Sequence, residues 1–107
     1  MCAHHHNVYV VELDPSVREN LAFYIANPNS SLDLPCVYVG MTGPTPEERF
    51  ARHKAGVQHS RIVHRFGLRL LPQMYEHLNP MPYNAALQME VELAEELRAK
   101  GYGVWQH

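Results

Sequence analysis

The chain has little of several features that would assign it to a class. Its 107 residues include only two cysteines, Cys2 and Cys36, and these have neither metal-ligand spacing nor a disulfide framework. No cationic, apolar, cleavable segment opens the chain, and its apolar runs fall far short of the ~20 residues that a membrane-spanning helix needs. We therefore expect one compact, reduced, cytoplasmic domain over residues 1–107.

Net charge is also small, but it is unevenly distributed. With neutral histidines the chain carries −2, which argues against a protein that coats nucleic acid through bulk electrostatics. The segment from Arg49 to Tyr75 nevertheless contains no acid. Its cationic residues and histidines, here called the basic stripe, are Arg49, Arg52, Lys54, Arg61, Arg65 and Arg69 with His53, His59 and His64. The stripe fits a track for a phosphate backbone, and it fits equally a solvated helix face that pairs with acids elsewhere.

Two similar strand-like runs each carry one tyrosine among β-branched residues, which favour a pleated, half-buried surface. The runs are Val8-Tyr9-Val10-Val11 and Val37-Tyr38-Val39-Gly40. They predict strands over about 7–13 and 36–41, with a third strand at 68–71 and a final strand or tail at Val104-Trp105. Tyr9 and Tyr38 can then project from neighbouring strands and form a site, or they can be core residues whose hydroxyl groups reach the rim.

A short helix is predicted after the first strand. Asp14-Pro15 offers an N-cap followed by proline at the first helical position. Val17, Leu21 and Ile25 recur at i, i+4 and i+8, which puts them on one face. The polar and proline-containing stretch over 27–34 predicts a loop that leads into the second strand.

Three further helices have start or stop signals. Thr45-Pro46-Glu47-Glu48 matches a capping box and predicts a helix over 46–55 that ends at Gly56 in the left-handed conformation. A second helix is predicted over 61–66, and a long one over 83–100 that ends at Gly101.

Glu90 lies near the middle of the apolar arc of the long helix. The arc consists of Ala86, Leu87, Met89, Val91, Leu93, Ala94 and Leu97. A carboxylate on a buried face must be paired, metal-bound or protonated, because an isolated buried charge is costly. Glu90 is therefore either a ligand or half of a buried ion pair with an arginine, whereas Glu92, Glu95 and Glu96 are predicted to be solvated.

Four motifs follow one another in a set order along the chain. They are Val8-Tyr9-Val10, Val37-Tyr38-Val39-Gly40, Arg49-Phe50-Ala51-Arg52-His53 and Ala86-Leu87-Gln88-Met89-Glu90. In this order they resemble the GIY-YIG nuclease superfamily, and the resemblance covers almost the whole chain. It implies an α+β (α/β) domain with a small central, mainly antiparallel three-stranded sheet flanked by helices.

The resemblance also implies a role for each candidate residue. Glu90 would be the sole protein ligand of a divalent cation, Mg²⁺ or Mn²⁺, and Arg49 would hold the scissile phosphate. Tyr38 or Tyr9 would help to activate the attacking water while the other orients it, and His53 would assist through hydrogen bonding. The protein would then be an endonuclease that hydrolyses phosphodiester bonds of DNA, with RNA left open as a partner.

In such an enzyme the basic stripe would contact the nucleic-acid backbone through Arg52, Lys54, Arg61 and Arg65. The short apolar runs predict no membrane partner.

The chain departs from the family pattern at four places. Valine replaces the glycine of the first motif, and a helix and loop inserted at about 14–35 separate the two tyrosine motifs. Met41 stands where many members have lysine, and Tyr102 stands where an asparagine is expected. These departures leave open a binding module that keeps the fold and grips nucleic acid or protein without turnover.

A third reading is a metal-buffering or adaptor protein that uses the histidines at the start of the chain. His4-His5-His6 could contact a metal, although consecutive histidines cannot all turn to one ion. The same run also fits a disordered terminus or a cloning remnant.

Overall fold

The computed structural model describes residues 5–57 and 60–106. Its strands are β1 (Asn7–Leu13), β2 (Cys36–Thr42), β3 (Gly67–Leu70) and β4 (Gly103–Gln106). Its α-helices are α1 (Leu21–Ala26), α2 (Pro46–Ala55), α3 (Arg61–Phe66) and α4 (Tyr83–Ala99). Short 3-10 helices are η1 (Pro15–Glu19), η2 (Pro72–Met74) and η3 (Glu76–Leu78).

The strands form one mixed sheet in the order β3-β1-β2-β4. β1 pairs antiparallel with both β2 and β3, whereas β4 pairs parallel with β2. The predicted α+β class and the antiparallel centre are confirmed. The sheet has a fourth strand, β4, where a final strand or tail was predicted. The reason is α4, which carries the chain back along the sheet so that the short segment after Gly101 can join β2 as a parallel edge strand.

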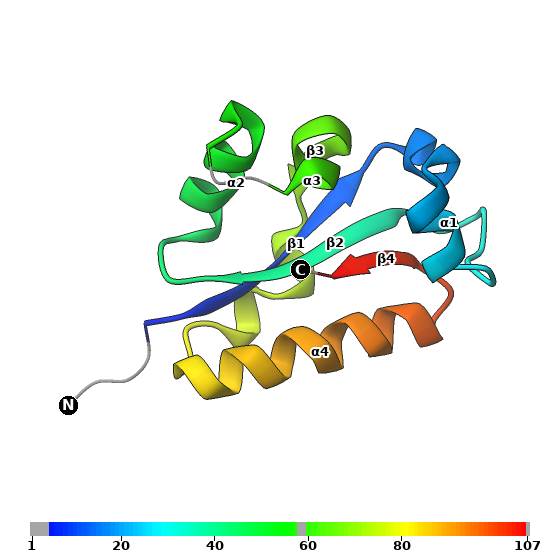
Figure 1. The fold of residues 1–107 in the computed structure, drawn as a ribbon. Coiled ribbons are helices and arrows are strands. Elements are labelled where there is room, and N and C mark those ends of the chain that lie inside the picture. The colour runs from blue at the N-terminus through cyan, green and yellow to red at the C-terminus, as the bar shows by residue number, and fades with distance from the viewer. Residues whose placement is uncertain (1–4, 58–59, 107) are drawn as a thin grey trace.

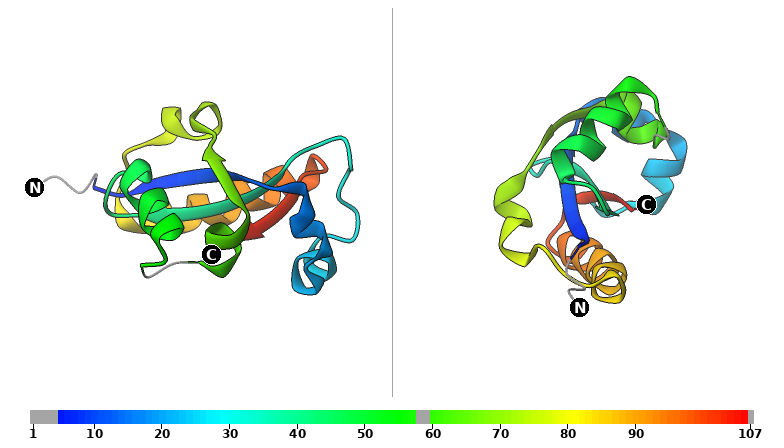
Figure 2. Two further views of the ribbon diagram at one scale, coloured as in Figure 1. Left: turned by 90° about the horizontal axis from the view of Figure 1, so that it is seen from above. Right: turned by 90° about the vertical axis from the view of Figure 1, so that its left-hand side faces the viewer.

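Helices lie on both sides of the sheet. In Figure 1, α4 runs below the strands and α2 and α3 lie above them, and the end-on view of Figure 2 shows the strands between these two groups. Because both faces are covered, the central strands are buried along almost their whole length, from Val8 to Val11 and from Cys36 to Gly40. This explains why the two tyrosine runs are apolar without strict alternation.

α2 forms as its end signals predict. The Thr45 hydroxyl accepts a hydrogen bond from Glu48 N–H, and the Glu48 side chain reaches back to the Thr45 backbone, so the capping box is complete. The helix ends at Gly56, whose φ of 81° lies in the left-handed region. α2 thereby begins and ends where it can present Arg49 and His53 to the sheet.

The segment between β1 and β2 differs from its prediction. Asp14 does accept a hydrogen bond from Ser16 N–H, but the chain forms η1 and then breaks at Asn20 before α1 begins. Val17 and the residues after Asn20 therefore do not lie on one continuous helix. Leu21 and Ile25 are 71% and 66% exposed instead of sharing the buried face of Val17. Phe23 is the α1 residue that enters the core.

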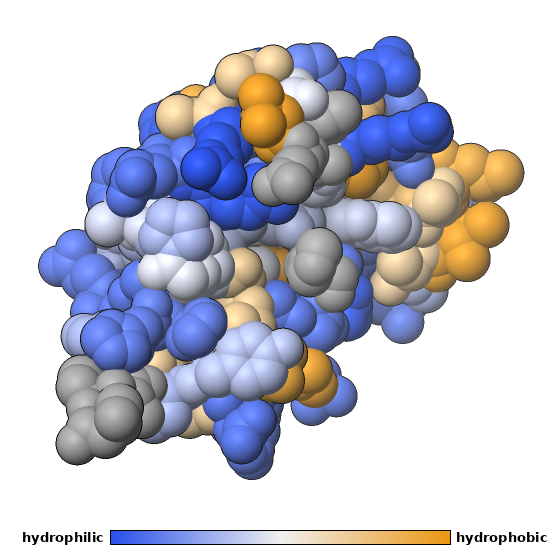
Figure 3. All heavy atoms as spheres, turned by 60° about the vertical axis from the view of Figure 1, so that its left-hand side comes forward, coloured by the Kyte–Doolittle hydropathy of each residue, from blue (hydrophilic) through white to orange (hydrophobic). Residues whose placement is uncertain are grey.

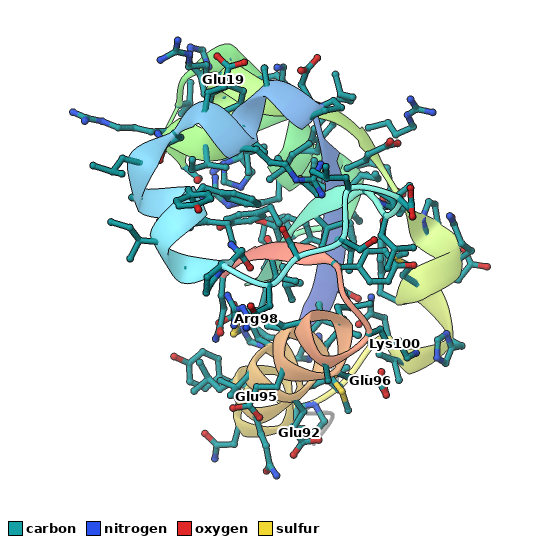
Figure 4. All side chains as sticks on the ribbon, turned by 90° about the vertical axis from the view of Figure 1, so that its right-hand side faces the viewer. Glu19, Glu92, Glu95, Glu96, Arg98 and Lys100 are labelled. Carbon is teal, nitrogen blue, oxygen red and sulfur yellow. The ribbon has the colours of Figure 1, made fainter. Side chains whose placement is uncertain are left out.

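α4 has the predicted extent, but its buried stripe is narrower than the predicted arc. Leu87 and Val91 are exposed, so their placement on the buried face was wrong. The buried residues are Ala86, Glu90, Leu93, Ala94 and Leu97, a helical i, i+4, i+7, i+8, i+11 spacing. Glu90 thus lies within the buried stripe, as predicted, and Figure 4 shows Glu92, Glu95 and Glu96 pointing away from the sheet.

Within the described ranges, none of the helices is both long and apolar enough to cross a bilayer.

Candidate active site

Tyr9 and Tyr38 share one face of the sheet. Tyr9 lies opposite Gly40, and Tyr38, two residues before Gly40, lies opposite Val11. The two rings are consequently diagonal neighbours, with centroids 6.0 Å apart. Both side chains are almost completely buried, each 1% exposed.

Gly40 makes this approach possible. A Cβ atom at this position would lie 2.8 Å from the Tyr9 hydroxyl oxygen and 2.9 Å from Tyr38 Cε2. Real Cβ atoms essentially never make such contacts, so a side chain here would push the two phenols apart. The glycine of the second tyrosine motif therefore has a geometric role in the site.

His53 reaches the two tyrosines from α2. It is fully buried, and its Nε2 lies 2.8 Å from the Tyr9 hydroxyl oxygen. Its ring centroid is 6.1 Å from that of Tyr9 and 5.7 Å from that of Tyr38. The other ring nitrogen, Nδ1, accepts a hydrogen bond of 2.9 Å from the backbone N–H of Ser60. The predicted Tyr9, Tyr38 and His53 are thus brought together as one cluster.

Arg49 and Glu90 contribute opposite charges to this cluster. The Arg49 guanidinium lowers the pKa of both phenols, whereas the Glu90 carboxylate raises it. Glu90 comes from α4, is 6% exposed, and has its Oε1 3.5 Å from the side-chain amide of Gln106. Arg49 comes from α2, one turn before His53. Arg49 and Glu90 therefore both act on the two phenols that His53 contacts.

The two phenols have different acidities. Burial, above all, raises the pKa of Tyr9 well above its ordinary value, and the neighbouring Tyr38 adds to the rise. Burial also raises the pKa of Tyr38, to about 12, but hydrogen bonds from Tyr9 and Ser60 oppose this rise. Tyr38 is accordingly the phenol of the pair that ionises more readily.

Glu90 has the donor chemistry that a hard divalent cation prefers. Its carboxylate oxygens suit Mg²⁺ or Mn²⁺, and a single protein carboxylate is enough for Mg²⁺, which keeps most of its waters. Residues 5–57 and 60–106 contain no group of three or more His, Cys, Asp or Glu residues arranged to hold a metal ion. Among the described residues, a cation held by Glu90 would thus have fewer than three protein ligands of these types.

Two members of the basic stripe are engaged by the fold. Lys54 Nζ donates to the backbone carbonyls of His64 and Gly67, at 3.0 and 2.9 Å, where α3 ends. Arg69 lies 3.1 Å from the Glu12 carboxylate of the neighbouring strand. The prediction that Lys54 contacts a nucleic-acid backbone therefore competes with a structural role.

The other predicted contacts, Arg52, Arg61 and Arg65, are exposed. Figure 3 shows hydrophilic side chains gathered over the upper part of the molecule, where α2 and α3 lie. Arg65 also lies over the Phe66 ring, with its guanidinium carbon 5.1 Å from the ring centroid. His64 is exposed, and His59 lies outside the described residues.

The histidines near the start of the chain lie apart from this cluster. His4 lies outside the described residues, and His5 is exposed. His6 pairs with Met81 through two backbone hydrogen bonds, and its ring contacts Tyr83 edge to face. Among the described residues, nothing brings His5 or His6 to the tyrosine cluster.

Sequence reasoning missed two residues that touch the site. Ser60 matches the N-cap pattern for α3, and its hydroxyl does accept from Val63 N–H, but this signal says nothing about His53. Gln106 lies at the end of β4, and only the parallel pairing of β4 with β2 brings it to Glu90. Both contacts join segments whose proximity depends on the tertiary fold.

Comparison with known proteins adds no relative: no family model, no curated protein and no solved structure matches this chain.

Proposed function

We propose that this chain is a divalent-metal-dependent endonuclease of GIY-YIG type that hydrolyses phosphodiester bonds of DNA. The observation that carries the proposal is the convergence of Tyr9, Tyr38 and His53 at a point where Arg49 and Glu90 exert opposite charges. Hydrolysis of a phosphodiester builds negative charge on the phosphoryl oxygens, and a guanidinium can bind two of those oxygens at once.

Each residue has a chemical task in this proposal. Arg49 holds the phosphate. Tyr38, the more acidic phenol, first releases its own proton to solvent, and the resulting phenolate takes the proton of the attacking water. Tyr9 remains neutral and donates to the Tyr38 oxygen, while His53 holds Tyr9 in place. A divalent cation bound to Glu90 would supply positive charge that favours the Tyr38 phenolate and stabilises the transition state.

Glu90→Gln tests the metal-dependent step. The substitution keeps the size of the side chain but removes its charge, so we expect DNA cleavage with Mg²⁺ or Mn²⁺ to fall at least ~100-fold while DNA affinity is retained. Glu92→Gln, on the exposed side of the same helix, is the matched control and should cleave at the wild-type rate. The assay uses labelled single-stranded, branched and duplex DNA and a matched set of RNA.

A wild-type chain that cleaves none of these substrates with either cation would overturn the proposal. Equal rates for Glu90→Gln and the wild type would do the same.

One observation favours a second candidate, a nucleic-acid- or protein-binding module that retains the fold without catalysis. Tyr9, Tyr38 and His53 are 0–1% exposed, so a water molecule and a phosphate have little direct access to the phenols. A module of this kind would bind the same DNA panel through the exposed arginines of the stripe and show no cleavage that Glu90→Gln could remove.

A further inference from the structure

Among the described contacts, the backbone N–H of Ser60 donates its hydrogen bond to His53 alone. Ser60 is the N-cap of α3, so its N–H takes no part in the hydrogen bonds of that helix. It points instead at Nδ1 of the His53 ring, at 2.9 Å. A backbone amide can only donate, and therefore Nδ1 must be the accepting nitrogen of this ring.

This contact determines where the imidazole proton resides. With Nδ1 accepting, a neutral His53 carries its hydrogen on Nε2, which lies 2.8 Å from the Tyr9 hydroxyl oxygen. An imidazolium would instead place two N–H groups face to face at Nδ1. The Tyr9 oxygen consequently receives a hydrogen bond from His53, and the hydroxyl hydrogen of Tyr9 must point elsewhere.

We propose that Ser60 is a positioning residue: its backbone N–H locks His53 in the neutral Nε2–H form, so that His53 donates to Tyr9 and the Tyr9 hydroxyl donates to Tyr38. The nearby Tyr38 ring, 6.0 Å from the Tyr9 ring between centroids, is the neighbour that can accept this hydrogen. The pKa shifts of the two phenols agree with this direction of donation, because the hydrogen bond between them lowers the pKa of Tyr38 and raises that of Tyr9.

The direction of this relay has a consequence for chemistry, which rests on the proposed function. A histidine that donates through Nε2 cannot take a proton from Tyr9, so His53 is excluded as the general base of a hydrolysis at this site. The relay runs from Ser60 through His53 and Tyr9 to Tyr38, and it leaves the Tyr38 oxygen as the proton acceptor. The tautomer itself does not depend on whether the protein cleaves DNA.

Two substitutions at one position separate the backbone donor from the side chain. Ser60→Pro removes the N–H, and the φ of −80° at this residue is close to the value that proline imposes. Ser60→Ala is the matched control, because it removes the same hydroxyl but keeps the N–H. Both variants lose the α3 cap, so a difference between them reports on the amide N–H and on the proline ring that replaces it.

The measurement is the ¹⁵N chemical shifts of the imidazole nitrogens at pH 7 in the full chain without DNA. The chain has eight histidines, so the His53 signals are assigned by their loss in His53→Gln. We expect a pyridine-type Nδ1 and a pyrrole-type Nε2 in the wild type and in Ser60→Ala. In Ser60→Pro this separation should shrink as the other tautomer or the imidazolium becomes populated.

A wild-type spectrum with the proton on Nδ1, or with an imidazolium, would overturn the inference even if Ser60→Pro does not fold. A folded Ser60→Pro variant with an unchanged His53 spectrum would overturn it as well. If His53 has the predicted tautomer but the protein cleaves no DNA, the hydrogen-bond relay is supported and the nuclease proposal is overturned. The experiment therefore distinguishes failure of the relay from failure of the proposed function.

Discussion

At the scale of single residues, the site depends on the missing side chain of Gly40. In Gly40→Ala, the new Cβ would lie within 3 Å of ring atoms of both Tyr9 and Tyr38, and neither ring has a flexible end that could move away. We expect a loss of about 1–3 kcal/mol in the free energy of unfolding, as overpacked cores show. Urea denaturation followed by circular dichroism would measure it.

Gly43→Ala is the matched control for this substitution. Gly43 is exposed, and its nearest neighbour to an added Cβ is His6 Nε2 at 3.8 Å, an ordinary van der Waals distance. The control should lie within about 0.5 kcal/mol of the wild type. Equal effects at the two glycines would contradict the close approach of the two phenols.

The buried phenols also predict how stability depends on alkaline pH. Burial raises the pKa of Tyr38 and of Tyr75 to about 12, from 10.0. Below pH 10 these phenols are neutral in the folded and in the unfolded chain, so their contribution to the free energy of unfolding is fully present. Between pH 10 and 12 only the unfolded chain ionises, and each phenol should lower the free energy of unfolding by about 1.4 kcal/mol per pH unit.

Urea denaturation at pH 8, 10 and 11 would measure this slope. Tyr38→Phe should reduce the slope by the contribution of one buried phenol. Tyr24→Phe, which removes an exposed phenol of α1, is the comparison. A wild-type protein whose stability is constant from pH 8 to 11 would contradict the raised pKa values.

At the scale of elements, the side chain of Asn27 links α1 to β4. Its side-chain amide donates to the carbonyls of Phe23 and Val104, at 2.9 and 3.0 Å, and its Oδ1 accepts from Val104 N–H and from Arg98 Nε. Asn27 is buried, so Asn27→Ala would remove the side-chain partner of the Val104 N–H and of the Phe23 carbonyl, whereas the Val104 carbonyl would keep its hydrogen bond from Arg98 Nη2. We expect a loss of about 2–4 kcal/mol in the free energy of unfolding.

Asn29→Ala, on the exposed turn that follows, should change stability by no more than about 0.5 kcal/mol. Thermal and urea denaturation of both variants would test the difference. If Asn27→Ala is as stable as Asn29→Ala, the anchoring of α1 through this side chain is wrong.

The elements also show which sequence signals were sufficient. α2 could be predicted residue by residue, because its capping box and its terminal glycine are local interactions. The face of α1 could not, because a helical spacing was read across Asn20, where η1 ends and the phase of the helix is lost. In α4 the apolar Leu87 and Val91 are exposed, while the charged Glu90 is buried, since neighbouring elements decide which part of a helix they cover.

At the scale of the whole molecule, the site combines distant parts of the chain. Tyr9 and Tyr38 could be selected from the sequence by their strand-like runs, and Glu90 by its place on an apolar helix arc. His53 could be selected through its place in the ordered motifs. Ser60 and Gln106 could not, because their contacts arise only when α3 and β4 are placed against the sheet. Local patterns therefore identified the reactive groups, and the tertiary fold supplied the groups that orient them.

The charge distribution leads to a prediction about nucleic-acid binding. Arg52, Arg61 and Arg65 are exposed on α2 and α3, whereas Lys54 is engaged with backbone carbonyls and Arg69 with Glu12. If the stripe contacts DNA, each of the three exposed arginines that meets a phosphate should contribute about 0.7–0.9 to the slope of log K against log salt. Fluorescence anisotropy with labelled DNA, at salt concentrations from about 50 to about 200 mM, would measure the slope.

We expect Arg61→Gln and Arg65→Gln each to weaken binding and to flatten the salt slope without lowering stability. Lys100→Gln, at the exposed end of α4 on the far side of the sheet, removes the same charge and should leave the slope unchanged. Lys54→Gln should instead lower stability, because it removes two hydrogen bonds that close α3. If all four variants shift the slope equally, binding follows net charge, and the stripe is not the surface that DNA contacts.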